Sequence, residues 1–162
     1  MEIPERQPLR TTLGLYADAK AYQRALTRVH MRVTDFGKAI LSNPAFACAS
    51  SCEEVALTQR SVAELGFPEG ATYKNISERA LNSGLHFCPA EVGPALRLSY
   101  RDQPRPQCLA IAMFPLAIDK HESRIFLVAH SHGHGGDWKM LAGGNATYKV
   151  WAPDTTFLFK NA

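Results

Sequence analysis

The spacing of apolar residues separates a first half that predicts helices from a second half that predicts strands. From Ala17, apolar side chains recur at the i, i+3, i+4 and i+7 spacing of one helix face; they are Tyr22, Ala25, Leu26 and Val29. Thr34 and Thr72 are suitable N-caps for a short second helix and a longer third helix. Gly84 stands where the third helix needs a left-handed C-terminal residue. The pattern therefore predicts that residues 15–84 are mainly helical.

Residues 85–162 predict strands and turns. Five apolar runs alternate with segments rich in turn-forming residues; they are LRLSYR, CLAIAMFPLAI, RIFLVAH, WKMLAG and TFLFK. Connections this short favour antiparallel neighbours. We therefore expect a single α+β domain over residues 1–162, with a loose N-terminal arm at 1–14 and a mainly strand part at 85–162. The sheet should be antiparallel, with four or five strands in the C-terminal half and the N-terminal helices packed on one face.

Composition is that of an ordinary globular protein. The chain has 162 residues, of which 46% are hydrophobic and 20% charged, enough apolar material for one core without cross-links. No apolar run approaches the ~20 residues of a membrane helix, and no signal peptide follows the charged start. The four cysteines are too few and too irregularly spaced for a disulfide framework. We therefore expect a cytoplasmic protein with reduced thiols and no membrane partner.

The stretch LHFCPAEVGPALRLSY, residues 85–100, joins the two halves and carries polar side chains among apolar ones. If LRLSYR is a strand, Arg97 lies on its polar face, near Glu91 from the preceding loop. Arg97 can then form a structural pair with Glu91, or leave its fork free for an anion. Our leading hypothesis is a non-enzymatic binding protein for a small anionic ligand or a partner protein at the helix–sheet junction. Arg97 would contact the anion, Glu91 would orient it, and Tyr100 and Trp138 would form apolar walls.

A small enzyme is the alternative hypothesis, and it rests on histidines or on a cysteine. His130, His132 and His134 alternate in one segment, a pattern that can hold a metal. The neighbouring glycines predict a hairpin tip instead, with Asp137 as the only carboxylate nearby in sequence. Cys88 is a candidate nucleophile, although a cysteine before a proline at a strand edge is typical of a core. Because no recognised catalytic motif is present, we assign no catalytic residue, no metal site and no cofactor.

Nucleic-acid binding is a second alternative. Basic residues recur every four positions along the first predicted helix; they are Lys20, Arg24, Arg28 and Arg32. Such a stripe can meet phosphates, but it is also typical of a solvated helix face. The formal net charge is only +3, and aromatic residues do not interleave with basic ones. Nucleic acid is therefore not an expected partner, whereas a symmetric homodimer is compatible with the predicted sheet edge.

The motif CPAEVGPALRLSY at residues 88–100, together with SVAELGFPEGATY at 61–73 and the following DQP, resembles a family of small bacterial hypothetical proteins. The similarity extends more loosely through AMFPLAI and the tryptophan after the histidine segment. It implies no fold, substrate or catalytic residue, and the association of such proteins with mobile elements supplies no mechanism. That family carries acidic residues where this chain has its histidines, which argues further against a metal site.

Overall fold

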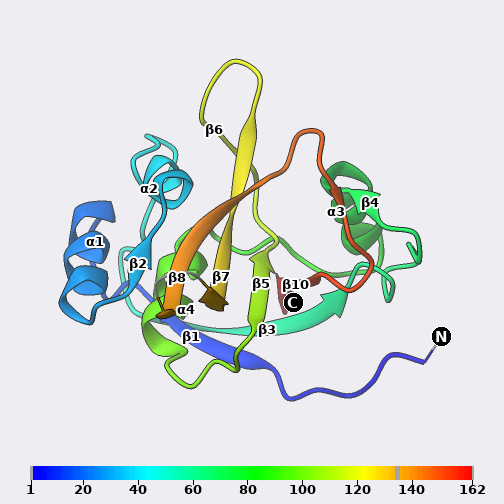
Figure 1. The fold of residues 1–162 in the computed structure, drawn as a ribbon, viewed down its shortest axis with the longest axis horizontal. Helices are drawn as coiled ribbons and strands as arrows, with labels where there is room; N and C mark the ends of the chain where they lie inside the picture. Colours follow the sequence, from blue (N-terminus) through cyan, green and yellow to red (C-terminus); the bar gives the residue numbers. More distant parts are fainter. Residues whose placement is uncertain (1, 134–135, 162) are drawn as a thin grey trace.

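A curled, mixed β-sheet packs against a helix that is buried over most of its length (Figure 1). The computed structural model describes residues 2–133 and 136–161. In these residues the main sheet has eight strands, which are β1 (Leu9–Leu13), β2 (Arg32–Val33), β3 (Glu53–Ser61), β5 (Gln107–Ile111), β6 (Leu116–Ala117), β7 (Ser123–Gly133), β8 (Gly136–Asn145) and β10 (Thr156–Lys160). A separate antiparallel pair consists of β4 (Ala71–Thr72) and β9 (Val150–Trp151). The helices are α1 (Ala19–Arg28), α2 (Asp35–Leu41), α3 (Tyr73–Asn82) and α4 (Val92–Ser99).

The strands of the main sheet run in the order β1-β3-β10-β5-β7-β8-β2, and β6 pairs with the start of β7. Neighbours are antiparallel except for two parallel pairs, β10 with β5 and β8 with β2. The combination of helices with a sheet is confirmed. The prediction of four or five strands understates the sheet, because β1, β2 and β3 from the first half join five strands from the second half. The purely antiparallel arrangement is wrong, because two of the pairs are parallel.

α4 is the central element, and it corrects the prediction that LRLSYR is a strand. Residues Val92–Arg97 are all buried, and the helix contacts β1, β7 and β8. Because β1 and β8 lie far apart in the strand order, the sheet must curl around α4 to reach both. Pro94 is tolerated in the first turn, where its missing N–H would have no helical partner. Because six consecutive residues of α4 are buried and Ser99 is its one exposed position, its sequence lacks the charged, solvent-facing side that marks α1.

α4 and α2 cover the same face of the sheet. A Cβ at Gly93 of α4 would lie 2.4 Å from the ring of Phe126, and a Cβ at Gly143 would meet Phe36 and Ile40 of α2. Phe126 and Gly143 lie directly opposite one another on β7 and β8, so the Phe126 side chain and a Cβ at Gly143 would point to the same face of the sheet. The expected packing of the N-terminal helices on one face is therefore present for α2, while α4 belongs to a segment that was predicted to be strand.

The predicted starts of α2 and α3 are confirmed, whereas α1 begins at Ala19 rather than Ala17 and Val29 lies after its last residue. Tyr22, Ala25 and Leu26 are buried on α1. The Thr34 hydroxyl accepts a hydrogen bond from the Gly37 N–H at 3.1 Å and caps α2, and Thr72 caps α3 in the same way. In the part of the chain that the structure describes, no helix combines the length and the apolar character needed to cross a bilayer.

Two predictions about the N-terminal region are wrong. The arm predicted at 1–14 is a strand over its last part, where β1 pairs with β3. The basic stripe does not stay on one helix, because α1 ends at Arg28 and Arg32 belongs to β2. His30 separates them with a φ of 59°, a left-handed backbone that no α-helix continues through.

Candidate functional site

Glu91 is a buried carboxylate at the N-terminal end of α4, with 1% of its surface exposed. One carboxylate oxygen accepts hydrogen bonds from the Gly14 N–H at 2.8 Å and from the Tyr22 hydroxyl, and the other accepts one from the Ala49 N–H at 2.7 Å. A negative charge at this end of a helix is also favoured by the helix dipole. Glu91 therefore ties the turn after β1, helix α1 and the segment around Ala49 to α4.

Arg97 lies at the other end of α4 and is completely buried. Its two terminal nitrogens donate to the side-chain oxygen of Gln103 at 2.6 Å, to the Ala129 carbonyl at 2.8 Å and to the Tyr100 carbonyl at 2.7 Å. Burial lowers the pKa of Arg97 to about 10, which still leaves it charged at neutral pH. The expected ion pair with Glu91 is wrong. Each charge is stabilised by its own hydrogen bonds, Glu91 at the N-terminal end of α4 and Arg97 at the C-terminal end, where the helix dipole favours its sign.

Tyr100 and Trp138, the two expected apolar walls, occupy different surroundings. Tyr100 directly follows α4 and is partly buried, and burial raises the pKa of its hydroxyl. Trp138 lies on β8, where the guanidinium of Arg32 sits 4.2 Å from its ring centroid. The structure thus brings Tyr100 next to Arg97, while the ring of Trp138 is covered by a cation from β2. None of the four predicted site residues lines the pocket described next.

The best-defined pocket of the described residues lies between β1, α1 and α4, with a volume of about 380 Å³. Apolar side chains from the three neighbouring segments form much of its wall; they are Leu15, Tyr16, Tyr22, Ala25, Val29 and Leu98. Sequence reasoning missed this pocket because its walls come from residues 10–29, Glu54 and residues 95–101, which carry no shared local motif. Only the repeated arginines of the first helix gave a signal, and they were interpreted as a surface stripe.

The rim of the pocket carries three arginines. Arg10 is paired with Glu54 at 3.1 Å, and both side chains are exposed. Arg28 on α1 and Arg101 after α4 are exposed and make no ion pair or side-chain hydrogen bond with any residue in 2–133 or 136–161. Two unpaired guanidinium groups therefore stand beside an apolar wall. Tyr22 connects this pocket to the interior, because its hydroxyl donates to the buried carboxylate of Glu91.

The residues of the enzyme hypothesis are placed in unreactive surroundings or outside the described part. Cys88 has 4% of its surface exposed, and burial raises the pKa of its thiol to about 12, which opposes the thiolate that a nucleophile needs. The ring nitrogens of His130 contact the Gln103 carbonyl at 2.6 Å and the carboxylate of Asp137. The side chain of His132 and the whole of His134 lie outside the described residues. No group of three potential ligands gathers within the described ranges.

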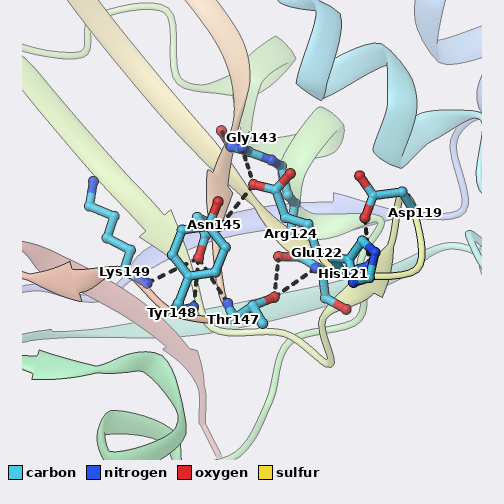
Figure 2. A network of polar contacts seen from close by, with 10 residues as sticks. Asp119, His121, Glu122, Arg124, Gly143, Asn145, Thr147, Tyr148 and Lys149 are labelled. Atoms are coloured by element: carbon cyan, nitrogen blue, oxygen red, sulfur yellow. Dashed lines mark hydrogen bonds and ion pairs between the residues drawn. The ribbon is translucent and has the colours of Figure 1, made fainter.

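A second polar cluster lies around Asn145 and Glu122, and its side chains bond mainly to one another and to nearby backbone groups (Figure 2). The buried side chain of Asn145 accepts hydrogen bonds from the backbone N–H groups of residues 147–149 and donates to Glu122 at 2.8 Å. Glu122 also pairs with Arg124, whose guanidinium covers the ring of Phe36. Most donors and acceptors of the cluster pair with one another, although the buried Nε of Arg124 has no hydrogen-bond partner among the described residues. The cluster shapes the turn after β8.

Comparisons with known proteins gave no match: no protein-family model, no curated protein and no solved structure is significantly similar to the chain. The resemblance to a family of small bacterial proteins therefore stays an expectation. Function must be inferred from the residues and geometry of the chain itself.

Proposed function

We propose that the protein is a binding protein whose pocket between β1, α1 and α4 takes a ligand with an apolar body and an anionic group. The observation that carries this proposal is the position of Arg28 and Arg101, exposed and without partners among the described residues, on the rim of an apolar pocket. The proposal keeps the anionic ligand and the helix–sheet junction of the sequence analysis. It moves the anion contact from Arg97, whose guanidinium faces protein carbonyls, to these two arginines.

The apolar wall supplies affinity without specificity. Each CH₂ group of a ligand that leaves water contributes about 0.8 kcal/mol, so a short alkyl chain offers several kcal/mol against the cost of immobilisation. A pocket of about 380 Å³ lies in the range that holds small ligands. Leu98 from α4 and Val29, directly after α1, both add aliphatic groups to the pocket wall. An alkyl or aromatic ligand body is therefore compatible with the pocket.

The arginines supply the preference for an anion. Because both side chains are exposed, each ion pair is screened by water and contributes only about 0.5–1 kcal/mol. Two such contacts together correspond to an affinity difference of about 5- to 30-fold between a charged ligand and its neutral analogue. The preference for the charged ligand should weaken as salt is added, because dissolved ions screen exposed charges and the Debye length is only about 10 Å at 0.1 M ionic strength.

A matched pair of probes tests the proposal. Octanoate and octan-1-ol share one alkyl chain and differ in the carboxylate, so their dissociation constants can be compared by chemical-shift titration of the labelled protein. We expect octanoate to bind about 5- to 30-fold more tightly than octan-1-ol. In the double variant Arg28→Ala/Arg101→Ala this difference should disappear while octan-1-ol binding is unchanged.

Arg24→Ala is the matched control, because Arg24 is an exposed arginine one turn earlier on α1 and does not line the pocket. It should leave the affinity for octanoate unchanged. Shifted resonances should lie in residues 10–29 and 95–101, the walls of the pocket. Equal affinities for octanoate and octan-1-ol, or shifts confined to another surface, would refute the proposed function.

A further inference from the structure

We propose that the occupant of this pocket is an extended acidic peptide segment that adds as a strand to the free edge of β1. This inference rests on the proposed function and names its ligand class. Three observations carry it: the direction of the backbone groups of β1, the position of the pocket beside them, and the basic rim.

The register of β1 determines which of its backbone groups face outward. Arg10 lies opposite Ala56 of β3. The Ala56 carbonyl accepts a hydrogen bond from the Asn161 N–H at 3.0 Å, so the backbone groups of Ala56 face β10 and not β1. Arg10 and Ala56 are therefore a non-hydrogen-bonded pair, and the N–H and C=O of Arg10 point away from β3. Because the direction alternates along a strand, the N–H and C=O of Thr12 point away as well.

These outward groups are unpaired in the described part of the chain. No backbone or side-chain hydrogen bond involves the main chain of Arg10 or Thr12 on that side, and both residues line the pocket. At the next outward position, the Gly14 N–H donates to the carboxylate of Glu91. Glu91 therefore occupies the outward N–H at the end of the edge. The outward groups of Arg10 and Thr12, about 7 Å apart, stay open.

A peptide strand fits this edge better than a compact ligand. Main-chain donors and acceptors at alternate residues pair with a second strand, while pockets beside the edge take its side chains. The apolar wall of Val29 and Leu98 stands next to the open positions and offers room for one aliphatic or aromatic side chain. Exposed strand edges of this kind recruit other strands when they are left uncovered.

Charge selects the kind of peptide. Arg28 and Arg101 need an acidic partner, which a glutamate, an aspartate or a terminal carboxylate supplies. A second copy of this chain is the competing occupant. Pairing two β1 edges about a twofold axis would bring two basic rims together, and like charges across such an interface are destabilising. The geometry therefore favours an acidic segment of another chain.

An array of synthetic heptapeptides is the probe, with apolar residues at alternate positions and two acidic residues at the C-terminal end. We expect the array to yield binders that octanoate displaces. In the complex, the amides of Arg10 and Thr12 should become protected from hydrogen exchange, while the amide of Thr11, which faces β3, keeps its protection.

Backbone methylation of the best binder supplies the matched control. Methyl groups on the alternate amides that face β1 should weaken binding about 30-fold, because two backbone hydrogen bonds are lost. Methyl groups on the intervening amides keep the same side chains and should be tolerated. The protein variant Thr12→Pro removes one outward donor and should lower the affinity for the peptide, but since a proline can also disturb β1, the two methylated peptides decide the question.

The outcomes separate the two proposals. Suppose that octanoate binds as expected but the array yields no binder, or that the two differently methylated peptides bind equally well. The peptide inference is then overturned and the proposed function stands. If octanoate also fails to bind, the proposed function falls too. A sedimentation mass of two chains that returns to one chain in Thr12→Pro would identify a second copy as the occupant and overturn the inference.

Discussion

Replacing Glu91 by glutamine tests the buried carboxylate that holds α4 against three other segments. A glutamine side chain has one oxygen acceptor and one NH₂ donor, so it can keep the bonds from the Gly14 N–H and the Tyr22 hydroxyl but loses the one from the Ala49 N–H. A buried donor left unpaired costs about 1–3 kcal/mol. The two remaining bonds change from charge-assisted to neutral, at about 1 kcal/mol each. The free energy of unfolding should therefore fall by roughly 3–5 kcal/mol.

One effect has the opposite sign, because removing a buried charge also removes its desolvation cost. The three hydrogen bonds and the helix dipole are expected to outweigh it. Urea denaturation at pH 7 measures the balance, and thermal unfolding should show a midpoint lower by roughly 6–20 °C for a domain of this size. Glu78→Gln is the control: Glu78 is exposed on α3, pairs with Lys74 alone among the described residues, and should change stability by at most about 0.5 kcal/mol. Unchanged or increased stability of Glu91→Gln would refute the reasoning.

Two further predictions concern ionisable groups elsewhere. Burial raises the pKa of Glu64, but the hydrogen bonds and charge of Arg6 outweigh it and hold that pKa below its usual value. The stability that ionised Glu64 contributes is therefore present above its unfolded pKa of about 4.3 and is lost as the pH falls through its folded pKa. The urea midpoints of wild type and Glu64→Gln should converge as the pH falls below about 4.3 and through the folded value, and a constant difference would contradict this. Since burial raises the pKa of Cys88 to about 12, native protein treated with iodoacetamide at mildly alkaline pH should be alkylated at the exposed Cys52 and not at Cys88; peptide mapping that finds equal modification would disprove it.

The helices that the sequence predicted are those with one face in water. On α1, buried Tyr22 and Leu26 alternate with exposed arginines, and that contrast produces a readable period. α4 has no such contrast, because Val92–Arg97 are buried throughout. The short alternation in LRLSYR then resembles a strand, although Arg97 is as deeply buried as its apolar neighbours. Burial on all sides is a tertiary property that a local pattern cannot contain.

None of the four predicted site residues lines the candidate pocket. The unusual polarity of residues 85–100 did mark the fold's buried charges, Glu91 and Arg97. Their partners were not predictable, since Gly14, Ala49 and Ala129 contribute only backbone groups, which every residue carries. The pocket was missed because distant segments build it, as shown by Thr11 of β1, whose hydroxyl lies 3.1 Å from that of Ser99 on α4.

The position of β10 bears on how the protein is made. β10 follows every other strand of the main sheet in the sequence, yet it lies between β3 and β5 in the strand order. Strand pairing in the described residues joins β1 and β3 to the β5–β7–β8 group only through β10. During synthesis, both groups must therefore wait with an open edge until residues 156–160 leave the ribosome. A nascent or truncated chain is thus exposed to intermolecular strand pairing at two edges that the finished protein buries in its core.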